Sequence, residues 1–138
     1  MKLGKANRAY FAAAKAMTKM SDFPRVAVGA VVVCGHRIIS SGFNSCKTDT
    51  VQKKYNIYRF KEDTPASIHA EVMALKPLMG RKDIDFRHVE LYVYRENKNG
   101  EPALARPCIS CMQLIADLGL RHIYYTNNGG FSHEEIFH

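Results

Sequence analysis

Apolar residues recur at every third or fourth position from Gly4 to Met20, with lysines between them. This period predicts an amphipathic helix that turns one face to a core. Val26 to Cys34 is an almost continuous run of β-branched and apolar residues, which predicts a strand covered on both faces. Gly35-His36 then predicts a tight turn into a second strand, Arg37 to Gly42, so that the two strands form a hairpin.

The rest of the chain alternates between polar, helical and extended patterns. Residues 44–67 are polar, basic and rich in tyrosine, and they predict a long functional loop with one short helical piece. Beyond them we predict helices at Ser67–Met79 and Pro107–Leu118, strands at His88–Arg95 and Arg121–Thr126, a loop at Glu96–Arg106, and a turn at Asn127–Gly130 before a short tail.

This order of elements predicts an α/β fold, a three-layer α/β/α sandwich with helices on both faces of one sheet. The last two strands are joined through a helix and should therefore run parallel. In such sheets, sites form at the carboxyl ends of strands, where the next helices begin. With 138 residues, of which 46% are hydrophobic, the chain is long enough for one core, and we predict a single domain over residues 1–138.

The chain is basic, with 20 Lys and Arg against 13 Asp and Glu and a net charge of +7. A positive surface attracts phosphate-bearing partners. Because the basic residues are scattered along the chain, the charge alone does not distinguish a nucleotide substrate from a nucleic acid. No apolar run approaches the roughly 20 residues that would span a bilayer, and the N-terminal residues lack a secretory pattern. We therefore expect a soluble, cytoplasmic protein that does not bind a membrane.

Two short motifs carry the candidate chemistry, and each falls where a predicted helix starts. They are His69-Ala70-Glu71 and Pro107-Cys108-Ile109-Ser110-Cys111. A lone His is more often structural, and a lone Cys-x-x-Cys also fits a redox pair or half of a zinc knuckle. The two motifs together match the signature of zinc-dependent base deaminases. His69, Cys108 and Cys111 are therefore predicted to bind Zn²⁺, with a fourth position open to water.

Glu71 lies two residues from His69 and is not expected to be a ligand. Zinc lowers the pKa of a bound water from about 16 toward 7. The Glu71 carboxylate is predicted to take the proton of that water and to deliver it to the substrate, first to a ring nitrogen and then to the departing amine. The predicted reaction is hydrolytic deamination with release of ammonia.

A non-catalytic zinc module is the alternative from another class, a zinc-stabilised protein that binds a nucleotide or nucleic acid without turnover. It requires a fourth protein ligand, for which Cys46 is a better candidate than Cys34, because Cys34 lies at the end of an apolar strand. This alternative leaves Glu71 without a purpose at its position, so the enzyme is favoured.

Beyond these motifs, the sequence resembles the cytidine and deoxycytidylate deaminase superfamily, and most closely its phage and bacterial dCMP-deaminase-like members. The resemblance covers most of the chain and includes Val28–Val33, Ser41–Asn44, His69–Leu75 and Gly119–Tyr125. It implies a five-stranded mixed sheet flanked by helices and a homo-oligomer. It also implies that Asn44 hydrogen-bonds the substrate sugar or base and that the backbone of Ala70 contacts the base.

The branch of the superfamily decides the substrate. The sequence of His69–Leu75 resembles that of the tRNA adenosine deaminases, whereas the long Ser45–Ile68 segment resembles the deoxycytidylate deaminases. We predict that the substrate is cytosine in a nucleotide, with dCMP as the leading candidate. The alternative substrate is cytosine or adenine within RNA or single-stranded DNA. Arg106 is a candidate for the substrate phosphate, although for any single basic residue a solvated surface is the more common explanation. Tyr124 and Tyr125 alternate on a strand, and we place Tyr125 at the substrate.

Overall fold

The computed structural model describes residues 3–23, 26–59 and 66–136. Its first element is the predicted amphipathic helix, α1 (Lys5–Thr18), which buries Phe11 and Ala14. Within the described residues, no helix combines the length and the apolar character needed to cross a membrane.

One mixed sheet forms the middle of the molecule. Its strands are β1 (Ala27–Cys34), β2 (Arg37–Phe43), β3 (Val89–Glu96), β4 (Pro102–Ala103), β5 (His122–Asn127) and β6 (Gly130–Glu135). Five of them follow the order β2-β1-β3-β5-β6, and the two-residue β4 pairs with β3 outside this path. β1 and β2 form the predicted antiparallel hairpin, and β3 and β5 are parallel, as the crossover rule requires.

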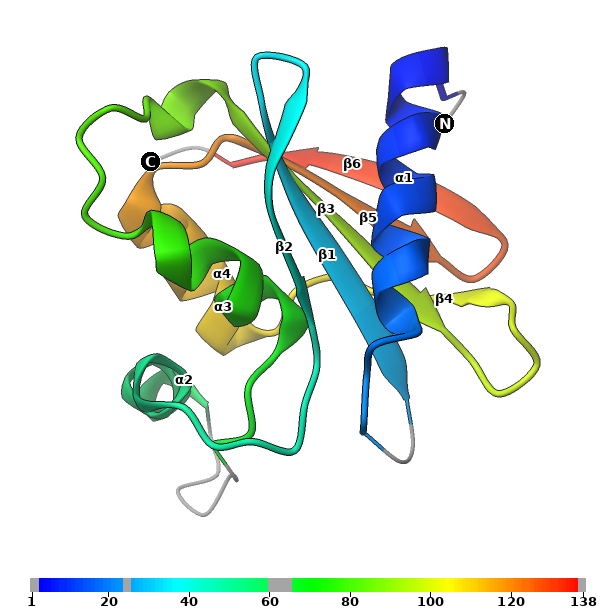
Figure 1. The fold of residues 1–138 in the computed structure, drawn as a ribbon, viewed down its shortest axis with the longest axis horizontal. Helices are drawn as coiled ribbons and strands as arrows, with labels where there is room; N and C mark the ends of the chain where they lie inside the picture. Colours follow the sequence, from blue (N-terminus) through cyan, green and yellow to red (C-terminus); the bar gives the residue numbers. More distant parts are fainter. Residues whose placement is uncertain (1–2, 24–25, 60–65, 137–138) are drawn as a thin grey trace.

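The two faces of the sheet bury different side chains. Along β1, Val31 and Val33 pack with Phe11 and the rest of the α1 cluster, while Ala30 and Val32 belong to the cluster on the opposite face. This alternation is the period of two that a strand covered on both sides must show. Figure 1 shows α1 separated by the strands from the other three helices, which confirms the predicted sandwich.

These three helices are α2 (Thr50–Tyr55), α3 (Ala70–Leu75) and α4 (Ile109–Leu118). α2 is the short helical piece predicted in the long loop. α3 begins three residues later than predicted, because Ser67 is extended and pairs with Thr48. α4 begins two residues later than predicted, because Pro107 precedes its N-cap rather than occupying its first turn. Gly119 ends α4 in the left-handed conformation that favours glycine.

The sequence predicts only a short tail after Gly130, but this segment forms β6, which pairs antiparallel with β5 over its whole length. Its residues Phe-Ser-His-Glu-Glu are mostly polar and partly exposed, as suits the edge of a sheet, so hydrophobic periodicity gives little signal there. β6 matters for the site because it carries Glu134, which contacts Arg106.

Candidate metal centre and substrate pocket

The three predicted metal ligands come together although 39 residues separate His69 from Cys108. His69 is the N-cap of α3 and Cys108 is the N-cap of α4, while Cys111 lies one turn further along α4. The Nδ1 atom of His69 lies 3.5 Å from Cys108 Sγ and 3.4 Å from Cys111 Sγ. One imidazole and two thiol groups thus converge where two helices begin.

This geometry fits a tetrahedral zinc ion. Zn–S bonds of about 2.3 Å and Zn–N bonds of about 2.0–2.1 Å separate sulfur from nitrogen by roughly 3.5 Å at a tetrahedral angle. The donor atoms of His69, Cys108 and Cys111 all lie within 4.8 Å of one another, and among the described residues this is the one such group. Cys34 and Cys46 are free and lie outside it, so neither is placed to close the fourth position.

The ligands polarise one another. A hydrogen bond from Cys111 lowers the pKa of the Cys108 thiol to about 3, and the same contact together with burial raises the pKa of Cys111. Burial lowers the pKa of His69, but its hydrogen bond with Cys108 and the carboxylate of Glu71 outweigh this and raise it overall. A thiolate beside an imidazole is the arrangement in which a divalent cation displaces the remaining protons.

Glu71 lies in the first turn of α3 and is buried, with 6% of its surface exposed. Burial raises the pKa of its carboxyl group, although the neighbouring imidazole of His69 partly opposes this. A carboxyl group with a raised pKa is suited to exchange a proton near neutral pH.

Gly42 allows α3 to lie this close to the sheet. A Cβ atom there would be 2.4 Å from the carbonyl oxygen of Ala70 and 2.6 Å from the backbone nitrogen of Ala74. Only a residue without a side chain fits between β2 and the first turn of α3. The glycine in Ser41–Asn44 therefore has a packing role that sets the position of His69 and Glu71.

A cavity of about 340 Å³ opens beside the ligands, within the usual size of a small-molecule site. His69, Glu71 and Cys108 form one side of it. Its other lining residues are Phe23, Val26, Val28, Asn44, Arg59, Ser67, Ile68, Ala70, Arg95, Leu104, Ala105 and Arg106. A larger cavity of about 720 Å³ lies beside α2 and shares Arg59, but none of the three grouped ligands lines it. The smaller cavity is therefore the candidate site.

Comparison with known proteins identifies the family. The family model described as the cytidine and deoxycytidylate deaminase zinc-binding region matches residues 5–127. The chain belongs to the cytidine and deoxycytidylate deaminase family. No curated protein matches its sequence.

Solved structures of this fold agree over most of the chain. The dCMP deaminase of cyanophage S-TIM5 superposes with a TM-score of 0.62 at 24% identity, covering 94% of this chain and 87% of that one. The cytidine deaminase of Burkholderia pseudomallei superposes with a TM-score of 0.62 at 21% identity, covering 93% and 91%. A second structure of the cyanophage enzyme, in complex with dCMP and dUMP, gives a TM-score of 0.61 at 22% identity and covers 91% and 83%. These likenesses show that the chain has the deaminase fold.

Three of the four predicted substrate residues, Asn44, Ala70 and Arg106, line the cavity of this deaminase domain. Asn44 is nearly buried. Its Oδ1 accepts from Val28 N at 2.9 Å and from the Ser21 hydroxyl at 2.5 Å, and its Nδ2 donates to Val26 O at 2.9 Å. The amide group is therefore fixed in orientation, and one of its two N–H groups is free of these bonds.

Tyr125 lies differently from the other three. It belongs to the core cluster beneath the helices, and its hydroxyl donates to Glu134 Oε2 at 2.7 Å. Glu134 in turn receives Nε of Arg106 at 2.7 Å and Nη2 at 3.1 Å. Tyr125 is thus not among the residues that line the cavity, and Glu134 links it to Arg106, which does line it.

Two residues of the site carry no recognisable sequence signal. Arg95 is the next-to-last residue of β3, and only the fold places it at the cavity with Arg59 and Arg106. Gln52 lies in the long loop, and its Oε1 accepts from the backbone nitrogen of His69 at 3.0 Å. Of the lysines near the long loop, Lys53 lines the larger cavity and Lys54 lies over the ring of Tyr55.

Proposed function

We propose that this protein is a zinc-dependent hydrolase that removes the amino group of cytosine in a nucleotide, in the manner of dCMP to dUMP, and releases ammonia. The observation that carries the proposal is the group formed by His69, Cys108 and Cys111 beside the buried Glu71, at the wall of a cavity. Three such donors are the ligand set typical of a catalytic zinc site, in which a fourth position would be open to water.

Each residue of the group has a defined task. His69, Cys108 and Cys111 would hold Zn²⁺, which supplies the Lewis acid that makes a water reactive at neutral pH. Glu71 accepts a proton from that water and passes it to the ring nitrogen next to the reacting carbon. A C–O bond forms at this carbon, the C–N bond to the amino group breaks, and Glu71 delivers the second proton of the water to the leaving nitrogen as ammonia.

The arginines that line the cavity favour a phosphate-bearing substrate. Arg59, Arg95 and Arg106 line it, and among the described residues neither Arg59 nor Arg95 is in an ion pair. Arginine binds phosphate through paired N–H donors, and Arg106 uses only two of its five donors on Glu134. The buried amide of Asn44 and the backbone of Ala70 are left for the sugar and the base. The relative that was solved with dCMP and dUMP supports the same substrate class.

The test is ammonia release from the zinc-loaded protein with dCMP, CMP, deoxycytidine, cytosine, adenosine and short C- or A-containing oligonucleotides. We expect release from dCMP and much less from deoxycytidine, which lacks the phosphate. Release only from oligonucleotides, with a steep dependence on salt, would replace the nucleotide by a nucleic acid as substrate. Zinc bound without any release would favour the non-catalytic module.

A homo-oligomer and a cytoplasmic location complete the proposal. The family resemblance supports the oligomer, which light scattering of the zinc-loaded protein tests directly. A fully active monomer would contradict it.

A further inference from the structure

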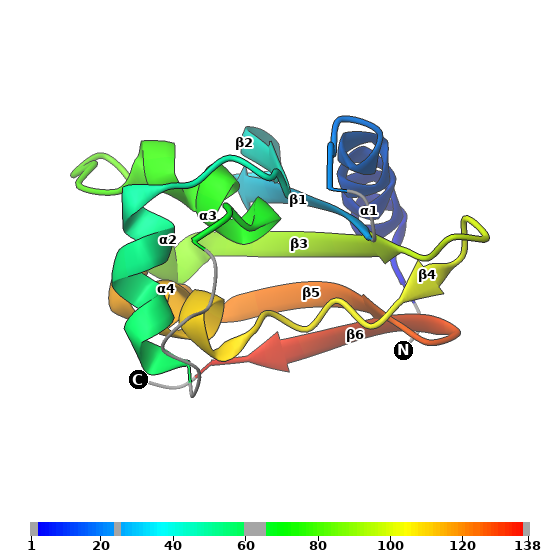
Figure 2. The ribbon, with the colours of Figure 1, turned by 90° about the horizontal axis from the view of Figure 1, so that it is seen from below.

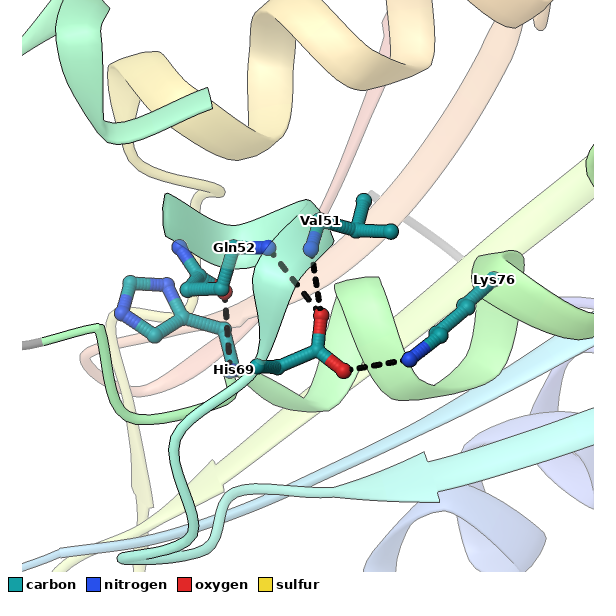
Figure 3. Close-up of polar contacts among 5 residues, drawn as sticks. Val51, Gln52, His69 and Lys76 are labelled. Carbon is teal, nitrogen blue, oxygen red and sulfur yellow. Dashed lines mark hydrogen bonds and ion pairs between the residues drawn. The ribbon is translucent and has the colours of Figure 1, made fainter. Parts of the chain in front are cut away.

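The segment that precedes α3 contains a buried side chain that reaches the metal centre. Gln52, in the middle of α2, is fully buried. Its Oε1 accepts from the backbone nitrogen of His69 at 3.0 Å, and its Nε2 donates to Asn56 Oδ1 at 2.9 Å. Figure 3 shows Gln52 between α2 and His69, joined to His69 by this bond. Because Asn56 accepts from the amide nitrogen, the amide oxygen must face His69.

α2 itself is anchored to the helix that His69 begins. Asp49, its N-cap, accepts from the backbone nitrogens of Val51 at 2.8 Å and Gln52 at 3.1 Å. The second oxygen of Asp49 pairs with Lys76 Nζ at 2.5 Å, directly after α3 (Figure 3). Asp49 and Gln52 therefore attach α2 to both ends of α3.

The other end of α2 is attached to the helix that carries the cysteines. The hydroxyl of Tyr55 donates to Asp117 Oδ2, near the end of α4, at 2.8 Å. Figure 2 shows α2 lying across α3 and α4. One short helix thus joins the two helices whose N-termini supply the three ligands.

We propose that Gln52 is a positioning residue for the metal: its bond to the His69 backbone fixes the imidazole of His69 relative to Cys108 and Cys111. The inference rests on the proposed zinc centre. His69 is an N-cap residue with extended backbone and has no side-chain cap of its own, so its orientation depends on contacts outside α3. Outer partners that fix the orientation of a ligating side chain typically raise metal affinity about 10- to 100-fold, and we expect the bond from the His69 backbone to act in the same way.

The decisive variant is Gln52→Met, which keeps the length and most of the volume of the side chain and removes the acceptor. We expect its dissociation constant for zinc, measured by competition with a chromophoric chelator, to rise about 10- to 100-fold. The visible spectrum of the Co²⁺-loaded protein, which reports coordination geometry, should change as well. Gln52→Glu keeps an acceptor oxygen toward His69 and should restore the wild-type spectrum and most of the affinity.

The matched control is Ser40→Ala. The Ser40 hydroxyl also bonds the backbone of α3, donating to Ala74 O at 2.6 Å, but Ala74 lies near the end of α3, whereas His69 is its N-cap. Ser40→Ala should lower the free energy of unfolding while leaving zinc affinity and the Co²⁺ spectrum unchanged.

The outcomes separate the two proposals. If Gln52→Met keeps the wild-type zinc affinity and Co²⁺ spectrum, the role of Gln52 is overturned. It is also overturned if Gln52→Met and Gln52→Glu lose zinc affinity equally while circular dichroism shows that both are folded. If Gln52→Met does not fold, Gln52→Glu alone tests the proposal. An altered Co²⁺ spectrum in folded Gln52→Glu would then contradict the proposed role of the bond between Gln52 and His69. Wild-type protein that binds neither zinc nor cobalt would instead overturn the proposed function.

Discussion

The floor and the rim of the cavity are built in opposite ways. At the floor, formed by His69, Glu71, Cys108 and Cys111, the side chains of Glu71 and Cys111 are buried, and Gln52 of α2 accepts a hydrogen bond from the backbone of His69, the N-cap of α3. At the rim, Arg95 is exposed and 48% of the Arg106 side chain is accessible. Charges interact strongly in the low dielectric of a buried site and weakly at a solvated surface. We therefore expect the floor to determine the reaction and the rim to adjust which substrate enters.

The largest effect should come from the floor. Glu71→Gln keeps the shape of the side chain and removes the group that moves protons, so we expect turnover of dCMP to fall about 100- to 10,000-fold. Zinc content, measured by atomic absorption, should stay at the wild-type value because Glu71 is not a ligand. Unchanged turnover would remove Glu71 from the mechanism.

A comparison of two glycines tests whether the packing under α3 matters for the floor. A Cβ atom at Gly42 would meet the backbone of α3, and one at Gly29 would meet the carbonyl oxygen of Ala14 in α1. Overpacking of this kind costs typically 1–3 kcal/mol, so both alanine variants should unfold at lower urea concentration. Only Gly42→Ala should also weaken zinc binding. Equal zinc affinity in the two variants would show that this contact does not position the ligands.

At the rim the expected effect is smaller and depends on the substrate. Arg95→Ala should raise KM for dCMP about tenfold, equivalent to about 1.4 kcal/mol, because one phosphate contact is lost. KM for deoxycytidine should not change, and the difference should shrink as salt is added. Steady-state kinetics with both substrates measures this directly, and an equal change for both would mean that Arg95 does not contact a phosphate.

The smallest effect concerns the pair that holds Arg106. The hydrogen bond from Arg106 lowers the pKa of Glu134, so the pair stabilises the fold above the ordinary pKa of glutamate and loses this contribution as pH falls through the lowered value. For a partly exposed pair the contribution is less than about 1 kcal/mol. Glu134→Gln should thus be slightly less stable than wild type in urea at pH 7, and the difference should shrink as pH falls below the ordinary pKa of glutamate. A difference that stays constant as pH falls would have another cause.

The sequence predicts the floor better than the rim, for physical reasons. Two motifs at helix starts are enough to predict His69, Glu71 and the two cysteines as one site, because zinc chemistry restricts both residue type and spacing. The structure brings these residues together, and zinc binding itself remains a prediction. Hydrophobic periodicity likewise predicts α1 and the hairpin, and the crossover rule predicts the parallel pair β3 and β5.

What the sequence does not predict depends on contacts between distant segments. Arg95 and Gln52 reach the site only because β3 and α2 pack where they do, and neither residue type is unusual in its local sequence. β6 is a polar edge strand, so its pairing and the contact of Glu134 with Arg106 are invisible to a hydrophobic pattern. The predicted starts of α3 and α4 lie three and two residues too early, because Ser67 pairs with the distant Thr48 and because Pro107 precedes the N-cap of α4.

The most direct test of the central claim is a zinc titration of metal-free wild-type protein followed by ammonia release from dCMP. We predict that the rate rises in proportion to bound zinc and levels off at one zinc per chain, as expected for a single group of His69, Cys108 and Cys111. A protein that binds one zinc per chain and releases no ammonia from dCMP would contradict the proposed substrate, and turnover that continues without zinc would contradict the proposed chemistry.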